Sequence, residues 1–373
     1  MLKDYSKTAH KPNLGNVAVI GGCGFLGHHV VNLLIECYHT YSITVIDLHT
    51  TRNRRPELDG VLYIDVDITD TEHLTSVMRT TRPDVVIHTA SPPAQADISV
   101  SRSLFENVNV NGTRSVIEAS QKAGAKAIVY TSSASVVSDN KSDLIHVDER
   151  WPVLRGSQQM EYYARTKAEA EDLVLAANRQ EPYDLLTAAI RPSGIIGEGD
   201  TMVTHQMMKI YQEGKHNVQL GENENLFDFT YVVNVAHGHL LAANALLHAS
   251  DSDSMPVDKR VDGEAFFITN DSPVYFWDFA RAVWKAAGNS SGLENIWVLP
   301  CTVGLMLGFL SEIYFMMIRR PPTFNRQRII FSCMTRYFDI SKAKDRLGYQ
   351  PLVSLEEGIK RSVKWSLDKE KRD

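Results

Sequence analysis

The chain has 373 residues, of which 43% are hydrophobic and 23% are charged, and its formal net charge is −6 at pH 7. This length allows a large core and a second lobe, while the acidic balance leaves no broad basic surface, which argues against a nucleic-acid partner. Four widely separated cysteines predict neither a metal site nor a disulfide scaffold, and favour a reducing compartment. The first fifteen residues contain no apolar run, so we expect no ordinary secretory signal and an amino terminus that faces the cytosol.

The amino-terminal half alternates short, β-rich apolar runs with longer stretches of helical period. The expected strands are 16–20, 42–46, 61–64, 85–88, 127–131 and 185–190. Such alternation predicts an α/β fold, in which a doubly wound parallel sheet is covered by helices. We expect a Rossmann domain over residues 12–200 with a return segment near 228–250, a smaller carboxyl-terminal substrate lobe over 201–373, and a surface loop at 251–258.

A glycine-rich turn follows the first expected strand. Gly21, Gly24 and Gly27 have the spacing G-x-x-G-x-x-G, and a helix is expected to begin near Phe25. These glycines, Phe25 and Leu26 are assigned to the cofactor site. Glycine lets the backbone approach a pyrophosphate, which the amino end of a helix then attracts. Glycine-rich turns also arise for packing reasons, but the strand before this one and the helix after it favour a dinucleotide site.

The second expected strand leads into an acid that suits the same cofactor. Asp47 stands 20 residues beyond Gly27, where a carboxylate binds the adenosine ribose hydroxyls. An acid here repels the 2′-phosphate of NADP, whereas Arg52, Arg54 and Arg55 are close enough in sequence to reach one. The pattern therefore favours NAD and leaves NADP as an alternative.

Further cofactor contacts are expected at the carboxyl ends of the next strands. Asp67 and Ile68 follow the third strand, where an acid and an aliphatic residue hold the adenine; alternatively, Asp67 caps a helix together with Asp70. Ala90, which follows the fourth strand, is assigned to the cofactor site as well. Asn109 is expected to bind ribose, although it could simply order its loop.

Three side chains form the expected catalytic set. Tyr163 and Lys167 stand four residues apart, which puts them on one face of a helix. A free tyrosine has a pKa of about 10, so it needs a nearby cation such as Lys167 to act as a base. Ser133 follows the fifth strand and can hydrogen-bond the reacting oxygen. Each signal alone occurs by chance, but together they predict oxidation of a secondary alcohol; Tyr162 and His88 are expected to be structural.

One carboxyl-terminal segment departs from the pattern of a soluble protein. Residues 296–318 are mostly apolar, are interrupted by Pro300 and Glu312, and precede Arg319 and Arg320. This composition predicts membrane contact, either as a helix in the interface or as one that spans the bilayer. The alternative is a buried core helix.

On these motifs the chain resembles the 3β-hydroxysteroid dehydrogenase branch of the extended short-chain dehydrogenases. The resemblance covers nearly the whole chain, and within the branch the sterol-4α-carboxylate 3-dehydrogenases are most similar. The motifs that carry it are 21–27, 129–136, 148–152, 191–200, 226–236 and 263–271. Departures are modest: Cys23 stands where many relatives have Ser or Ala, and Glu198 where many have Pro.

The resemblance implies an activity. The 3β-hydroxyl of a 4α-carboxysterol would be oxidised to the 3-ketone, with loss of the carboxylate as CO2, in sterol C-4 demethylation. Ser133, Tyr163 and Lys167 would be catalytic, with Tyr163 and Lys167 also contacting the cofactor, and Pro192 and Ile195 would lie beside the nicotinamide.

The resemblance also implies a cellular location and partners, and it leaves alternative functions open. The catalytic domain would be cytosolic and attached to the endoplasmic reticulum membrane, with a sterol or terpenoid substrate. Either a second copy of the chain or a sterol C-4 demethylation complex is a possible partner. Alternative functions are a 3β-hydroxysteroid or terpenoid dehydrogenase of a specialised pathway, with or without decarboxylation, and an NAD-binding scaffold without catalysis.

Overall fold

The computed structural model describes residues 11–93, 101–249, 259–291, 296–318, 320 and 324–371. The expected surface loop at 251–258, Arg319 and the first ten residues lie outside these ranges.

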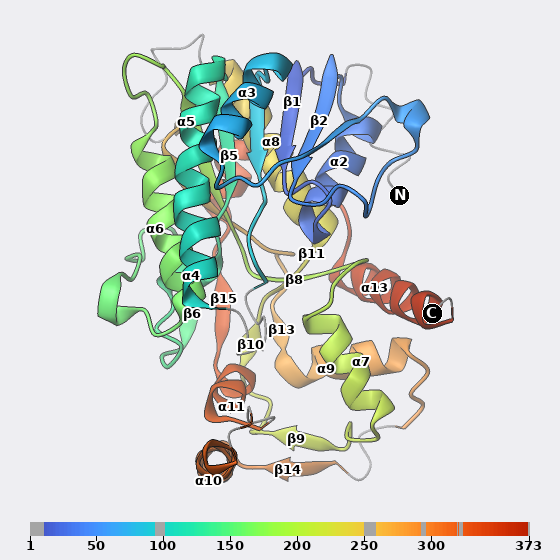
Figure 1. The fold of residues 1–373 in the computed structure, drawn as a ribbon. Helices are drawn as coiled ribbons and strands as arrows, with labels where there is room; N and C mark the ends of the chain where they lie inside the picture. The colour runs from blue at the N-terminus through green and yellow to red at the C-terminus, as the bar shows by residue number, and fades with distance from the viewer. Residues whose placement is uncertain are drawn as a thin grey trace.

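A seven-stranded parallel sheet forms the centre of the molecule (Figure 1). Its strands are β1 (Asn16–Ile20), β2 (Ser42–Asp47), β3 (Leu62–Asp65), β4 (Val85–His88), β5 (Ala127–Thr131), β7 (Leu186–Pro192) and β12 (Glu264–Ile268). They are ordered β12-β7-β5-β4-β1-β2-β3, and all neighbours are parallel. The strand order reverses between β1 and β4, and ligands of doubly wound sheets bind at such a point.

Helices cover both faces of this sheet, which explains why its inner strands are continuous apolar runs. One face packs against α2 (Phe25–Cys37) and α8 (Val232–Ala249). The other packs against α3 (Thr71–Thr81), α5 (Thr113–Ala123) and α6 (Tyr162–Ala176). Before α5 the chain runs through α4 (Arg102–Phe105) and a π-helical turn, η2 (Glu106–Gly112). The predicted doubly wound α/β fold is confirmed.

The second lobe is built from short strands and amphipathic helices around an aromatic core. Its sheet has the order β13 (Val274–Tyr275), β10 (Leu226–Phe227), β15 (Arg336–Phe338), β6 (Leu144–Val147). Two further pairs are β11 (Phe229–Tyr231) with β8 (Gly194–Ile196), and β14 (Trp297–Leu299) with β9 (Val218–Leu220). The helices of this lobe are α7 (Val203–Gln212), α9 (Phe276–Ala286), α10 (Cys301–Met317), α11 (Arg326–Cys333) and α13 (Leu355–Glu370). By contrast, α12 (Ser341–Leu347) packs against α8 and β12 of the main sheet. Phe229 and Phe279 stack at 3.6 Å in this core.

The two lobes exchange segments instead of dividing at residue 200. The sequence pattern assigns 264–268 to the substrate lobe, but these residues form β12 at the edge of the main sheet. Conversely β6, from the amino-terminal half, pairs with β15 in the second lobe. The helix α8, which lies within the range 228–250, packs against β5 and β7 of the main sheet. Strand pairing between distant segments leaves no local signal, so the periodicity of 264–268 could not reveal its partner.

The edge strand β12 is protected by a side chain of the 148–152 motif. The Glu149 carboxylate accepts a hydrogen bond from the backbone N–H of Phe267 at 2.7 Å. Burial raises the pKa of this carboxyl, and Lys342 opposes the rise. The contact satisfies a donor that an edge strand would otherwise expose.

Candidate active site

The glycine turn after β1 is shaped by two close approaches. Gly21 has φ +77°, and a Cβ on it would lie 2.7 Å from the backbone nitrogen of Ala90. A Cβ on Gly27 would lie 2.2 Å from the carbonyl oxygen of Gly21. Gly24 precedes α2, whose first turn receives no side-chain cap. The amino end of α2, with Phe25 and the buried Leu26, therefore keeps N–H groups that fit a pyrophosphate.

Asp47 faces this turn from the end of β2. Its Oδ2 accepts a hydrogen bond from the backbone N–H of Cys23 at 3.0 Å. Burial raises the pKa of the Cys23 thiol to about 11; Asp47 adds to the rise, whereas Arg54 and Arg52 oppose it. The acid and both exposed arginines thus surround one turn, where an adenosine ribose would lie.

The turn after β3 has its own capping arrangement. The Asp67 carboxylate accepts from the N–H of Thr69 at 2.9 Å, whereas Asp70 caps α3 by accepting from the N–H of His73 at 3.0 Å. The capping role therefore belongs to Asp70. Ile68 is buried, and the adenine role of Asp67 and Ile68 stays a prediction.

Asn109 is buried in η2 and uses both ends of its carboxamide within the protein. Its Nδ2 donates to Thr166 at 2.9 Å, and its Oδ1 accepts from the Ser91 hydroxyl at 2.9 Å. These bonds tie the turn to α6, so the loop-ordering role is present in the structure. The ribose role of Asn109 stays a prediction.

The three expected catalytic side chains converge at the carboxyl end of β5. Ser133 precedes a short 3-10 turn (Ala134–Val137), and its Oγ accepts from the N–H of Ser135 at 3.1 Å. The Tyr163 hydroxyl, from the first turn of α6, hydrogen-bonds Ser133 and Ser91. Lys167 lies one turn further and donates to the carbonyl oxygen of Thr131 at 2.7 Å.

Burial places both titrating groups far from their ordinary ranges. It raises the pKa of Tyr163 to about 12, although hydrogen bonds from Ser133 and Ser91 oppose the rise. It lowers the pKa of Lys167 to about 7, with Glu171 opposing. Tyr163 is therefore protonated at neutral pH in the chain alone, and Lys167 lies between its charge states. An oxidised nicotinamide bound here supplies the positive charge that favours a phenolate.

A buried ion pair fixes the helix that carries Tyr163 and Lys167. Arg191 of β7 and Glu171 of α6 are 5% and 1% exposed and lie 2.5 Å apart. The pair holds α6 against the sheet and thereby positions the helix for chemistry. Pro192, at the end of β7, is buried, and Ile195 in β8 is half-buried; their place beside the nicotinamide stays a prediction.

Two residues expected to be structural form hydrogen bonds with residues outside the catalytic set. His88 is buried and its Nε2 contacts the Thr113 hydroxyl at 3.0 Å, while burial lowers its pKa to about 3. The Tyr162 hydroxyl donates to Glu106 at 2.8 Å.

Sequence reasoning missed Ser91 and Arg336. Ser91 follows β4 at the edge of the sheet where ligands bind, and that position was a usable signal. The Arg336 guanidinium donates to the Ser135 hydroxyl at 2.9 Å, although 201 residues separate the two in the sequence. No local pattern marks such a contact.

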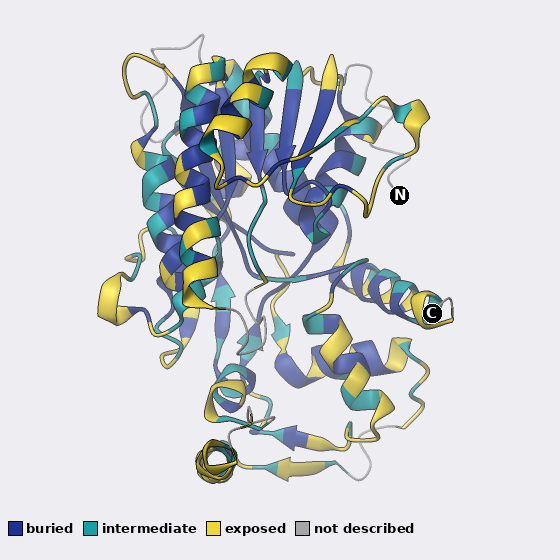
Figure 2. Cartoon of the chain, in the orientation of Figure 1, coloured by how far each residue is buried: buried dark blue, intermediate teal, exposed yellow. Residues whose placement is uncertain are grey.

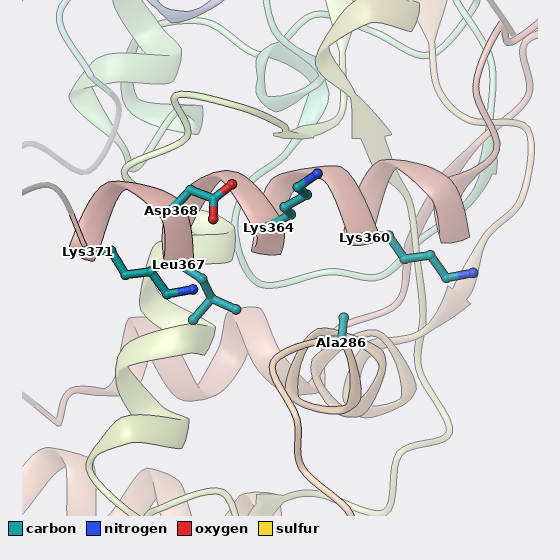
Figure 3. Close-up of a pocket in the computed structure, with 6 residues that line it drawn as sticks. All are labelled: Ala286, Lys360, Lys364, Leu367, Asp368 and Lys371. Carbon is teal, nitrogen blue, oxygen red and sulfur yellow. The ribbon is translucent and has the colours of Figure 1, made fainter.

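Two other pockets in the described part of the chain, and its His, Cys, Asp and Glu side chains, are candidates for a rival site. Within the ranges that the structure describes, no group of three His, Cys, Asp or Glu side chains could hold a metal. A pocket between α9 and α13 carries no catalytic residue (Figure 3); its lining is Ala286, Lys360, Lys364, Leu367, Asp368 and Lys371. Another pocket is lined by charged residues around Glu149 and Lys342 and also lacks the catalytic set.

Fold and site together define a class: the protein is an NAD(P)-dependent oxidoreductase with a Rossmann domain. The family model described as "3-beta hydroxysteroid dehydrogenase/isomerase family" matches residues 18–301. This match spans well over half of the chain, which therefore belongs to that family.

Curated relatives match nearly the full length. The chain is 40% identical to a decarboxylating sterol-4-alpha-carboxylate 3-dehydrogenase of Schizosaccharomyces pombe, over 96% of this chain and 99% of the relative. Identity is 37% to the enzyme of the same name from Saccharomyces cerevisiae, over 94% and 98%. It is 33% to the human one, over 92% and 86%.

Solved structures share the fold at low identity. A UDP-glucose 4-epimerase of Thermotoga maritima superimposes with a TM-score of 0.67 at 22% identity, covering 96% of this chain and 99% of that one. The UDP-glucose 4-epimerase of Thermus thermophilus in complex with NAD gives 0.66 at 22% identity, covering 94% and 98%. At this identity the likeness establishes the fold alone.

Proposed function

We propose that the chain oxidises the 3β-hydroxyl of a 4α-carboxysterol to the 3-ketone, and that the carboxylate leaves as CO2, in sterol C-4 demethylation. The observation that carries the chemistry is the half-buried Tyr163, whose hydroxyl interacts with Ser133 one helical turn before Lys167. The substrate class rests on the near full-length similarity to decarboxylating sterol-4-alpha-carboxylate 3-dehydrogenases.

Each catalytic side chain has one task in this proposal. Tyr163 takes the proton of the 3-hydroxyl, and Ser133 hydrogen-bonds the reacting oxygen. A bound oxidised nicotinamide would accept the hydride from C3. Lys167 holds the cofactor ribose and adds positive charge near the phenol. The product is a β-keto acid, whose carbonyl accepts the electron pair of the breaking C4–carboxylate bond, so decarboxylation needs no metal.

Product analysis tests this function. The protein is incubated with oxidised cofactor and a 4α-carboxy-3β-hydroxysterol, and the products are identified by mass spectrometry. A 3-ketone that has lost the carboxylate is the expected product. A 3-ketone that keeps it would instead assign the dehydrogenase of a specialised pathway, and an unchanged sterol would contradict the proposal.

We propose NAD as the preferred cofactor because the Asp47 carboxylate is hydrogen-bonded to the glycine turn, where we expect the adenosine ribose to bind. Replacing Asp47 with serine is expected to change the ratio of NAD to NADP affinity by roughly 10-fold or more in favour of NADP, since the charge that repels a 2′-phosphate is lost. Fluorescence titration with both cofactors measures the ratio. Adding Arg52→Ala and Arg54→Ala should reverse the gain in NADP affinity; an unchanged ratio in D47S would contradict the assignment.

Helix α10 is the surface that suits a membrane. Figure 2 shows it exposed at one end of the molecule. Only Gly304 and Gly308 are buried in it, so the alternative of a buried core helix is wrong. Its exposed apolar side chains are Val303, Met306, Leu307, Phe309, Leu310, Ile313, Tyr314, Met316 and Met317. No helix in the described part of the chain is long and apolar enough to cross a bilayer.

We propose that α10 lies in the interface of the endoplasmic reticulum membrane, with the catalytic domain in the cytosol. The helix has 17 residues. At 1.5 Å per residue this is about 25 Å, less than the roughly 30 Å hydrocarbon core, so an orientation along the surface is favoured. Exposed Trp297, next to α10, suits the headgroup region. Substrate sterols dissolve in the same membrane.

Vesicle flotation tests this surface. Met306, Leu310 and Met317 share one face of α10 and are 58%, 54% and 68% exposed. Replacing all three with glutamate is expected to lower the partition onto phosphatidylcholine vesicles by about 10-fold or more, because apolar burial is lost. Leu58→Glu, at a side chain 99% exposed on the Rossmann domain, is the matched control. Unchanged flotation would contradict the proposal, and loss of a dimer or of a demethylation complex instead would assign the face to a protein partner.

A further inference from the structure

A buried cation lies beside the catalytic serine. Arg336 is 5% exposed and is fixed in β15, which pairs with β10 on one side and β6 on the other. Its Nη2 donates to the hydroxyl of Ser135 at 2.9 Å, and the N–H of Ser135 donates to the Ser133 hydroxyl at 3.1 Å. One residue therefore links the guanidinium to the serine that contacts Tyr163.

The charge of this guanidinium is not neutralised by an ion pair. Among the described residues, no carboxylate lies within 4.0 Å of the Arg336 nitrogens. Glu161 acts on Arg336 electrostatically, but its own carboxylate accepts a hydrogen bond from Gln327. Burial lowers the pKa of Arg336 to about 10, so the side chain stays charged at neutral pH. Buried charges are normally paired, and an anion would complete this arrangement.

The position of Arg336 suits an anion carried by the substrate. In a 4α-carboxysterol, C3 and C4 are bonded to each other, so the carboxylate lies a few ångströms from the 3-oxygen. With that oxygen between Ser133 and Tyr163, Ser135 and Arg336 stand on the side of the serine. A guanidinium presents two parallel N–H donors that match the two oxygens of a carboxylate.

We propose that Arg336 binds the C4 carboxylate of the substrate, with Ser135 orienting the guanidinium. This inference rests on the proposed function. Arg336 is thereby the residue that selects carboxylated sterols, because a neutral group at C4 would leave the guanidinium buried without an anion.

The contact between Arg336 and the carboxylate is lost during the reaction. Once the 3-ketone has formed, the C4–carboxylate bond breaks and its electron pair passes to the 3-oxygen as an enolate. Ser133 and Tyr163 can hydrogen-bond that oxygen, and C4 then takes up a proton. The carboxylate leaves as CO2, which has no charge to hold it against Arg336.

Substrate selectivity of Arg336 variants tests the inference. Activity with a 4α-carboxy-3β-hydroxysterol is compared with activity on the 4α-methyl sterol, which lacks the anion. Arg336→Gln is expected to lower the kcat/KM ratio of the two substrates by roughly 10- to 100-fold, as expected for a lost hydrogen bond to a charged group. Arg336→Lys should recover part of the loss, and Arg281→Gln, outside the site, should leave the ratio unchanged.

The outcomes separate this inference from the proposed function. An unchanged ratio in Arg336→Gln that still binds cofactor would overturn the role of Arg336 alone. Should that variant fail to fold, the wild-type protein is tested with the 4α-carboxamide sterol. Its KM is expected to be at least tenfold higher than that of the 4α-carboxysterol. Equal KM values for the two sterols would overturn the inference. A wild-type protein that cannot convert the carboxysterol would overturn the proposed function itself.

Discussion

Replacing Tyr163 with phenylalanine is expected to lower kcat by about 10²- to 10⁴-fold, the usual contribution of a general acid–base group. The change removes only the hydroxyl that hydrogen-bonds Ser133 and Ser91. The ring, which packs edge-on against Phe105 with centroids 5.9 Å apart, is retained. Formation of reduced cofactor measures the effect.

Two measurements accompany this variant. Cofactor affinity should be largely retained, because the glycine turn and Asp47 are untouched. Tyr162→Phe is the matched control, since its hydroxyl bonds Glu106 at the protein surface and should not affect turnover. If Tyr163→Phe kept normal activity, the assignment of the base would be wrong.

Replacing Lys167 with methionine is expected to give a similar loss of activity, together with an altered dependence of stability on pH. Lys167 is 2% exposed, and burial lowers its pKa to about 7 from the ordinary 10.5. The unfolded chain therefore binds the proton more tightly than the folded one between these values. Lys167 thus lowers stability at neutral pH and below, and this penalty fades as the pH rises toward 10.

The unfolding free energy of both proteins without cofactor measures this linkage. From pH 7 to pH 9 the free energy of unfolding of the wild type should rise relative to that of Lys167→Met by on the order of 2 kcal/mol. The reason is that the folded chain binds about one proton fewer than the unfolded chain over most of that interval. Loss of the bond to the Thr131 carbonyl shifts both ends of this comparison equally and leaves the slope intact. A stability difference that does not change with pH would contradict a strongly lowered pKa for Lys167.

Local patterns were sufficient for most of the sheet. The ranges 16–20, 85–88 and 127–131 form β1, β4 and β5 with the predicted bounds, because strands buried on both faces are continuous apolar runs with clear ends. The assignment of β12 to the second lobe failed because its neighbour β7 lies about 75 positions earlier in the chain, and pairing at that separation has no sequence signature.

In the candidate site, local patterns likewise predicted some residues and not others. Ser133, Tyr163 and the glycine turn were predictable because strand ends and helical spacing fix their positions. The partners of Lys167 could not be predicted in this way. Its amine contacts the Thr131 carbonyl and the face of Tyr130, and the spacing along α6 does not specify either contact. Arg336 was beyond reach, since its contact with Ser135 depends on how the two lobes pack.

The exposed face of α10 could be predicted only in part. The hydropathy of 296–318 predicted membrane contact, but periodicity alone could not distinguish an exposed helix from a buried one. The structure excludes the buried alternative because Gly304 and Gly308 are the only buried residues of α10, where they pack against Ile329 of α11.

The most direct test of the central claim is the stoichiometry of the reaction. Purified protein in detergent is supplied with NAD and a 4α-carboxy-3β-hydroxysterol labelled at the carboxylate, and reduced cofactor and released CO2 are followed together. Oxidative decarboxylation predicts equal yields of the two products. Reduced cofactor without CO2, or neither product, would contradict it.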